Sequence, residues 1–347
     1  MAAVMDDNNL YDSIRECRLC PRNCGVDRTA GKTGFCNQTS TIRAARAALH
    51  HWEEPILSGS KGSGAVFFSG CNLRCIFCQN YSIALGECGK EITTYRLSDI
   101  FLELQSKGAH NINLVTGAPY IPHIRAALIM AKSQGLNIPI IYNSSGYENV
   151  NALKMLDGLI DIYLPDMKYY SSEIAGKYSK APDYFEKASL AIAEMVRQVG
   201  KPVIESGTVS KTISGTNSRI ISETEASDKP QNIPDIGPVD YNGDPLMLMK
   251  KGVIVRHLLL PDQTKDSKKI LRYLHETYGQ DIYISIMNQY TPLKQVENIP
   301  ELNRRVTSEE YDRVVNFAIR LGIDNAFIQD GETASESFIP AFDYEGI

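Results

Sequence analysis

Short apolar runs rich in β-branched and aromatic residues alternate with longer amphipathic stretches along most of the chain. Apolar residues recur at helical spacing in five of these stretches and predict helices over 97–105, 121–133, 149–156, 184–199 and 308–321. The short runs predict six strands, over 65–69, 111–116, 138–143, 159–164, 252–260 and 281–287. Six repeats of strand then helix form a parallel sheet, which right-handed crossovers curl into a full or partial barrel. The expected fold class is therefore α/β, a partial (β/α)6 TIM-like barrel.

Two segments interrupt this alternation. Residues 1–64 include a stretch, 41–51, whose alanines suit a helix or an alternating strand equally well. Residues 206–249 are rich in Ser, Thr, Gly, Asn, Asp and Pro, and so few apolar residues cannot bury a core. We expect this insertion to be disordered or loosely packed, on the N-terminal side of the barrel. The expected organisation is an N-terminal module (1–64), a core (65–330) that contains the insertion, and a C-terminal tail (331–347).

Composition narrows the functional classes. The chain has 347 residues, of which 43% are hydrophobic, so it is long enough for one large core. Its net charge of −5, without clusters of Lys and Arg, gives no reason to expect nucleic acid as a partner. The first residues are acidic where a signal peptide would be basic, and no stretch approaches the roughly 18 apolar residues of a membrane span. We therefore expect a cytoplasmic protein that does not contact membranes.

Seven of the eight cysteines fall into two tight groups. Without a secretion signal, such spacing favours metal ligation over disulfides, because cytosolic reductants keep thiols free. Cys88 stands apart from both groups, and we expect it to be a small buried apolar residue. The first group consists of Cys17, Cys20, Cys24 and Cys36, and the second of Cys71, Cys75 and Cys78.

The second group carries the strongest chemical signal in the chain. Residues 69–80 read Ser-Gly-Cys-Asn-Leu-Arg-Cys-Ile-Phe-Cys-Gln-Asn and follow a predicted strand. Three thiolates on one loop can each bind a different iron of a 4Fe-4S cubane, which leaves the fourth iron without a protein ligand. A structural zinc loop would require a fourth protein ligand. The spacing therefore predicts a 4Fe-4S cluster with one iron open for chemistry.

This segment resembles the signature of the radical S-adenosylmethionine (SAM) superfamily, Cys-x3-Cys-x-aromatic-Cys, with Phe77 at the aromatic position. The resemblance implies that the open iron binds the amino and carboxylate groups of SAM. It also implies that the reduced cluster cleaves SAM to a 5'-deoxyadenosyl radical, so the protein is expected to be an oxidoreductase. An external electron donor such as flavodoxin or ferredoxin is then expected as a partner.

Polar residues follow the later strands, where a barrel of this class places its active site. Thr116-Gly117-Ala118-Pro119 stands where the superfamily commonly has Gly-Gly-Glu, so the acidic residue is missing. The segments Asn143-Ser144-Ser145-Gly146, Pro165-Asp166-Met167-Lys168 and Arg256-His257 resemble the cofactor-binding strand ends of glycyl-radical activating enzymes. No catalytic residue beyond the cluster is assigned. The SAM contacts that the resemblance implies are Phe77, Thr116, Gly117, Asn143, Ser145, Asp166 and Arg256.

The first cysteine group offers four soft ligands, with glycines nearby for tight turns. Such a set suits structural zinc or an auxiliary iron-sulfur cluster; ligand type does not separate them, and we prefer zinc slightly. Together with His50-His51-Trp52-Glu53-Glu54-Pro55 and the second group, it resembles the PflX-type proteins, homologues of pyruvate formate-lyase activating enzyme. The resemblance extends over about 17–330, without the insertion. Within it, Glu53 and Glu54 precede the first strand and could line the mouth of the active site, but we expect a solvated acidic pair.

Three functions remain as hypotheses. The resemblance to the PflX-type proteins implies an enzyme that activates a glycyl-radical enzyme by abstracting hydrogen from a glycine of that partner protein. The same radical chemistry could instead act on a small molecule or a peptide. A non-catalytic metal-binding scaffold is the third hypothesis, in which both cysteine groups are structural.

Overall fold

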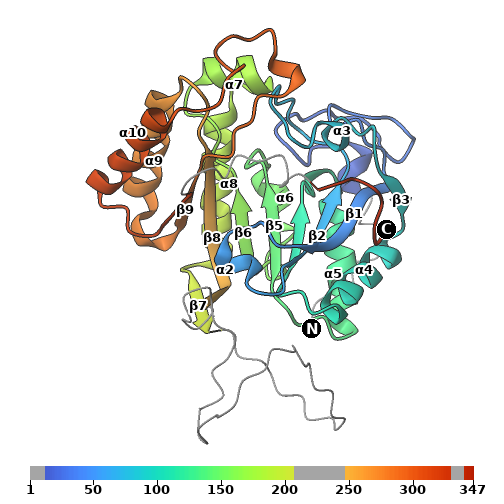
Figure 1. Cartoon of the computed structure of the whole chain (residues 1–347). Helices are drawn as coiled ribbons and strands as arrows, with labels where there is room; N and C mark the ends of the chain where they lie inside the picture. The colour runs from blue at the N-terminus through green and yellow to red at the C-terminus, as the bar shows by residue number, and fades with distance from the viewer. Residues whose placement is uncertain (1–11, 207–246, 330–339) are drawn as a thin grey trace, which may run out of the picture.

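The computed structural model describes residues 12–206, 247–329 and 340–347. Within these residues an open, curved sheet forms the centre of the molecule (Figure 1). Seven of its strands are parallel and lie side by side in the order β10, β9, β8, β6, β5, β4, β2. They are β2 (Ser63–Phe68), β4 (Ile112–Val115), β5 (Ile140–Ser144), β6 (Ile162–Pro165), β8 (Met247–Leu258), β9 (Tyr283–Met287) and β10 (Ala326–Ile328).

The prediction of a partial parallel barrel is confirmed. All six predicted strands are present, and the short strand β10 extends the parallel series by one. The sheet continues beyond β2 with two antiparallel strands, β1 (Ile42–His50) and β3 (Lys90–Ile92). The ambiguous alanine-rich stretch is thus a strand. Its small side chains face two different apolar clusters, since Ala44 and Ala47 pack in one and Ala45 in the other.

Helices cover one face of the sheet. The five predicted helices are found, together with two that the apolar pattern did not reveal, α7 (Ser172–Ser179) and α9 (Thr264–Tyr278). Short helices are α2 (Pro55–Ser58), α3 (Tyr81–Ala84) and the 3-10 turns η1 (Ala118–Tyr120), η2 (Gly279–Asp281) and η3 (Lys294–Val296). The predicted helices are α4 (Thr94–Ser106), α5 (Ile121–Ser133), α6 (Val150–Lys154), α8 (Tyr184–Val199) and α10 (Ser308–Leu321).

The two faces of the sheet have different environments. On β5, Ile140 and Tyr142 pack in the large core with the helices, whereas Ile141 faces the opposite, concave side. The helix α2 crosses the lower part of that concave side (Figure 1) and inserts Leu57 into a small apolar cluster there. The Asn111 side chain donates to the Leu57 carbonyl over 2.8 Å and holds the helix in place. The remaining upper part of the concave side, at the carboxyl ends of the strands, is lined by polar residues.

Residues 340–347 add to the sheet edge beside β1. The amide of Ala47 donates to the Glu345 carbonyl over 2.8 Å, and the amide of Tyr344 donates to the Ala45 carbonyl over 3.1 Å. Arg46 also forms ion pairs with Asp343 and Glu345. A segment roughly 300 positions away in sequence therefore completes the strand that precedes the first parallel strand.

The predicted insertion begins and ends at a short antiparallel pair. The strand β7 (Val203–Ser206) pairs with the first residues of β8. This pair lies at the end of the sheet opposite α7 (Figure 1), which agrees with the expected position on the N-terminal side of the barrel. The expected disorder of the insertion itself concerns residues outside those that the structure describes.

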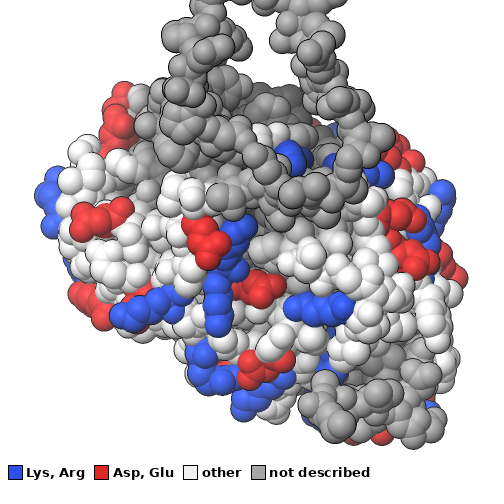
Figure 2. Space-filling view, turned by 90° about the horizontal axis from the view of Figure 1, so that it is seen from below, with Lys and Arg blue, Asp and Glu red and all other residues white. Residues whose placement is uncertain are grey.

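The surface gives no sign of a polyanion-binding face from below. In that view, acidic and basic side chains are interspersed over the described residues (Figure 2). None of the helices within the described ranges is both long enough and apolar enough to cross a bilayer.

Candidate functional site

The loop after β2 holds the second cysteine group on a fixed backbone. Gly70 begins the loop with a φ of 85°, a conformation that glycine adopts without a steric penalty. Farther along, the amides of Arg74 and Ile76 donate to the carbonyls of Ser179 (3.3 Å) and Tyr178 (3.0 Å), at the end of α7. The conformation of the loop is therefore fixed by the protein itself, without a bound ligand.

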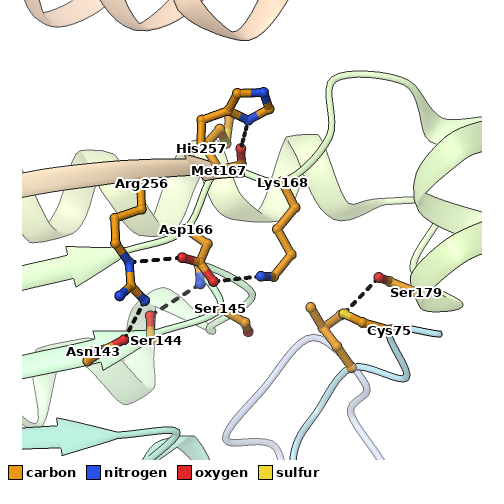
Figure 3. A network of polar contacts seen from close by, with 12 residues as sticks. Cys75, Asn143, Ser144, Ser145, Asp166, Met167, Lys168, Ser179, Arg256 and His257 are labelled. Atoms are coloured by element: carbon orange, nitrogen blue, oxygen red, sulfur yellow. Dashed lines mark hydrogen bonds and ion pairs between the residues drawn. The ribbon is translucent and has the colours of Figure 1, made fainter. Parts of the chain in front are cut away.

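The three thiols of this loop are half-buried and line one cavity. Burial, with a smaller contribution from the neighbouring Cys75 thiolate, raises the pKa of Cys71 and of Cys78 to about 12. The Ser179 hydroxyl donates to Cys75 Sγ over 2.9 Å (Figure 3). No three His, Cys, Asp or Glu side chains of the described residues surround a single ion.

The cavity has a volume of about 260 Å³ and lies above the carboxyl ends of β4, β5, β6 and β8. Its wall combines the cysteine loop with polar side chains from successive strand ends. This donor set fits an iron-sulfur cluster beside a charged amino-acid ligand, since thiols adjoin both cationic and anionic groups. Six of the seven expected SAM contacts line the cavity: Phe77, Thr116, Asn143, Ser145, Asp166 and Arg256.

Gly117, the seventh, does not line this cavity. It faces helix α5, where a β-carbon would come within 2.6 Å of Ile124 Cδ1. The glycine is therefore explained by the close packing of strand end and helix. The preceding residue, Thr116, adopts a φ of 62°, unusual for a β-branched residue, and donates its amide to the Asn143 carbonyl over 2.9 Å. Strain of this kind concentrates at functional sites.

A network of charged side chains occupies the floor of the cavity (Figure 3). The Asp166 carboxylate accepts from Lys168 Nζ over 2.6 Å and from Arg256 Nε over 3.1 Å. Arg256 also donates to Asn143 Oδ1 over 2.7 Å and contacts Glu53 Oε2 at 3.4 Å. The guanidinium thus joins residues from three strand ends and from the segment before α2.

The ionisation states in this network follow from burial and pairing. Burial alone would raise the pKa of Asp166, but Lys168 and Arg256 outweigh it and hold that pKa below its usual value. Burial likewise acts to lower the pKa of Lys168 and of Arg256, and the adjacent carboxylates raise both above their usual values. For Glu53 burial outweighs the attraction of Arg256, so its pKa is raised. Glu53 is thus the carboxylate of the network that takes up a proton most readily.

The expectation of a solvated acidic pair at Glu53 and Glu54 is wrong. The Glu53 side chain is only 9% exposed, lines the cavity and accepts from the Asn113 amide over 2.9 Å. Burial also raises the pKa of Glu54, which is hydrogen-bonded to Ser285. The segment that contains these two residues crosses the concave face of the sheet, so their carboxylates are buried between the segment and the sheet. Lys168 was also absent from the expected contacts, although it stands two residues after Asp166 on the same strand end.

Tyr184 on helix α8 holds two of the strand-end loops together. Its hydroxyl contacts the carbonyls of Ser145 (2.7 Å) and Asp166 (2.9 Å). His257, which follows Arg256 in sequence, is buried, and its Nδ1 lies 2.8 Å from the Met167 carbonyl. It therefore braces the Asp166 loop from behind, without lining the cavity.

We predict that Gly146→Ala disrupts this site more than a glycine substitution of equal backbone strain. Gly146 has a φ of 74°, and a β-carbon there would overlap the Asp166 carbonyl oxygen. Gly158 has a φ of 76° with open space around it. Alanine at Gly158 should cost only about 1–2 kcal/mol of unfolding free energy, the strain of a left-handed residue. Alanine at Gly146 should cost more and should also displace Asp166.

Urea unfolding and SAM cleavage assays on the two variants measure this difference. Equal losses of stability together with equal, near-wild-type cleavage would contradict the role given to the Gly146 turn.

The first cysteine group also gathers in space. Burial, with smaller contributions from the thiolates of Cys36, Cys17 and Cys24, raises the pKa of Cys20 to about 12. As with the second group, the four thiols do not converge on one ion-sized position among the described residues. Cys88, in contrast, packs beside the small apolar cluster around Phe67 and does not line the cavity. The assignment of zinc or an auxiliary cluster to this group stays a prediction from the sequence.

Comparison with known proteins finds a similarity that is centred on the core. Residues 65–216 match the family described as the Radical SAM superfamily. This range begins in β2 and includes the cysteine loop and the strand ends of β4, β5 and β6. The uncharacterized protein MJ0674 of Methanocaldococcus jannaschii is 26% identical over 318 residues, which cover 90% of this chain and 76% of that protein.

Similar solved structures share 11–13% sequence identity with the chain. HydG, a maturase of the FeFe-hydrogenase, has a TM-score of 0.46 over 74% of this chain and 48% of its own. Methylornithine synthase (PylB) has a TM-score of 0.43 over 72% and 59%, respectively. Streptococcus suis SuiB, solved with the precursor peptide SuiA, has a TM-score of 0.43 over 74% and 46%. The chain therefore spans about half the length of HydG and of SuiB.

Proposed function

On the premise that residues 65–216 form a domain of the radical SAM superfamily, we propose that this enzyme uses radical SAM chemistry to activate a glycyl-radical protein. One observation carries the chemistry: three thiols and a buried Arg256–Asp166–Lys168 network line the same cavity. Cys71, Cys75 and Cys78 would hold a 4Fe-4S cluster, and the network would hold SAM. When bound, the cluster and SAM supply reductive cleavage to a 5'-deoxyadenosyl radical, which abstracts a hydrogen atom.

The residues of the chain position and shield the reaction. Arg256 presents a guanidinium fork, the geometry that favours a carboxylate such as that of SAM. Asp166 and Glu53 balance its charge, and Asn143 fixes its orientation. Phe77, which is buried and stacks edge-on with Tyr290 at 6.0 Å, excludes water beside the cysteine loop. An external one-electron donor such as flavodoxin or ferredoxin would supply the reducing electron.

The resemblance of the strand-end loops to those of glycyl-radical activating enzymes supports a macromolecular substrate. A glycine on an exposed loop of a partner protein could present its reacting carbon at the mouth of the cavity, beside the three thiols.

The test is anaerobic incubation of reconstituted protein with SAM, a reductant and a candidate glycyl-radical enzyme encoded next to this protein. A doublet electron paramagnetic resonance (EPR) signal on the partner, lost when its reactive glycine is alanine, is the expected result. Cleavage of SAM without that signal would leave the radical chemistry and favour the second candidate, a peptide or small molecule bound at the same mouth. A reconstituted protein that does not cleave SAM would favour the non-catalytic scaffold.

We also predict that removal of residues 209–244 leaves SAM cleavage nearly intact. The strands β7 and β8, which flank the insertion, pair at the end of the sheet opposite the cysteine loop, so the deletion removes none of the described residues that line the cavity. Rates of 5'-deoxyadenosine formation by the deleted and full-length proteins are compared at equal iron content. Any loss should appear in the activation of the partner. A folded deletion variant without SAM cleavage would show that the insertion acts at the active site.

A further inference from the structure

A weakly paired donor and a weakly paired acceptor lie side by side in the charged network of the cavity. Arg256 donates from Nε to Asp166 over 3.1 Å and from Nη2 to Asn143 over 2.7 Å (Figure 3). Its remaining nitrogen, Nη1, lies 3.4 Å from Glu53 Oε2, whereas N–H···O bonds usually measure about 2.7–3.2 Å. Both atoms of this long contact can therefore form a shorter bond to a ligand in the cavity.

The other oxygen of Glu53 is held by two strands. Glu53 Oε1 accepts from the side-chain amide of Asn113 on β4 over 2.9 Å and from that of Asn143 on β5 over 3.4 Å. Both asparagines are buried, so the position of the carboxylate is fixed. An ionised carboxylate offers about four acceptor sites. Because the Glu53 side chain is 9% exposed and lines the cavity, a further donor to Oε2 can reach it from the cavity.

The two neighbouring carboxylates are engaged elsewhere. Asp166 already accepts from Lys168 over 2.6 Å as well as from Arg256. Glu54 is hydrogen-bonded to Ser285 and is not among the residues that line the cavity. Glu53 is therefore the carboxylate of this network that is available to a bound ligand.

A donor and an acceptor in this arrangement match the two polar groups of an α-amino acid. The guanidinium fork favours a carboxylate. A ligand carboxylate on Arg256 Nη1 would lie close to Glu53, and the repulsion between the two negative charges must be offset. In an α-amino acid the amino group is bonded to the same carbon as the carboxylate, so it would lie beside Glu53. An amino group retains N–H donors even when its nitrogen binds a metal.

We propose that Glu53 accepts a hydrogen bond from the amino group of SAM, and that Glu53 and Arg256 together select its amino-acid end. The placement of SAM in this cavity rests on the proposed function, and the contact with Glu53 adds to it. Glu53 belongs to the segment that crosses the concave face ahead of α2. That segment is therefore part of the cofactor site, as well as a cover for the lower part of the sheet.

The test compares two ligands on Glu53→Gln. Glutamine keeps the size of the side chain and an oxygen for Asn113, but it loses the negative charge. Equilibrium dialysis of anaerobically reconstituted protein measures affinity for SAM and for a deaminated SAM analogue, which lacks the amino group. Affinity for SAM should fall by about tenfold to a hundredfold, the effect of losing a hydrogen bond to a charged group. Affinity for the deaminated analogue should be the same in the variant and in wild-type protein.

Glu194→Gln is the matched control. The Glu194 side chain is 6% exposed and is paired with Arg197 at 2.9 Å on α8, outside the cavity. This variant should bind both ligands like wild-type protein. Glu53→Asp keeps the negative charge but withdraws it from the ligand, so it should show the same selective loss for SAM. It decides the question if Glu53→Gln does not fold.

Two results would overturn the contact between Glu53 and the amino group. One is wild-type affinity of the Glu53 variants for SAM. The other is an equal loss of affinity for both ligands, which would show that Glu53 acts only by orienting Arg256. Wild-type protein that binds neither ligand would instead refute the cofactor site of the proposed function. Wild-type protein that binds SAM without activating a glycyl-radical partner would leave the role of Glu53 to be decided by the same ligand comparison.

Discussion

We expect alanine at any one of Cys71, Cys75 or Cys78 to abolish SAM cleavage. The three thiols line one cavity and are the cluster ligands that we propose. A cubane held by two thiolates is lost or displaced from Arg256, so the reducing electron no longer reaches bound SAM. The measurement is the formation of 5'-deoxyadenosine and methionine by each variant after anaerobic reconstitution.

Cys88→Ala is the matched control for these three variants. Cys88 is another half-buried cysteine of the same region, and it packs beside the Phe67 cluster. It should retain wild-type cleavage and iron content. A single variant of the three that still cleaves SAM at a rate near wild type would show that the cluster ligands are misassigned.

The second large effect is expected from Arg256→Lys. Lysine keeps the positive charge between Asp166 and Glu53 but loses the fork that reaches a carboxylate and Asn143 at once. Loss of a charge-assisted hydrogen bond costs about 1.5–3 kcal/mol, so affinity for SAM should fall by about tenfold to a hundredfold. Equilibrium binding of SAM to the reconstituted variant measures this loss. Its iron content should be unchanged.

Lysine is chosen because an apolar residue at this position would mainly change the stability of the fold rather than the affinity for SAM. Arg256→Met would leave the buried Glu53 carboxylate without its cationic partner, at a cost of about 3–5 kcal/mol of unfolding free energy. Arg197→Lys, in an exposed ion pair with Asp157 on the helical side, is the control and should bind SAM like wild-type protein. If Arg256→Lys also binds SAM with wild-type affinity, the guanidinium does not contact the cofactor.

A helix or strand could be predicted from the sequence wherever its apolar residues form one continuous face. Six parallel strands could be located because their buried runs are bounded by turn residues. The alanine-rich β1 could not, since small side chains face two clusters and neither period dominates. Helix α9 was missed, although its amphipathic face packs against α10. The short strands β3 and β10, with three residues each, carry too little pattern to be recognised.

The site residues that directly follow strands were predictable from the sequence. The residue that reaches the cavity from a segment crossing the sheet was not. Cys71, Asn143, Asp166 and Arg256 stand at strand ends, so their meeting in one cavity follows from the topology. Glu53 reaches the same cavity from a segment that crosses the concave face. Nothing in the local pattern indicates that crossing, and a Glu in a polar stretch is usually solvated. Only the long-range contact with Arg256 shows that it is buried.

The contact between β1 and residues 340–347 affects the order in which parts of the fold can form during synthesis. During synthesis the ribosome delivers β1 nearly 300 residues before the segment that covers its edge. Until then β1 keeps unpaired amides and carbonyls, which other nascent chains could pair with. Pro340 also lines the cavity, so its wall is incomplete over the same interval. Insertion of an oxygen-sensitive cluster is therefore best timed after translation has passed this segment.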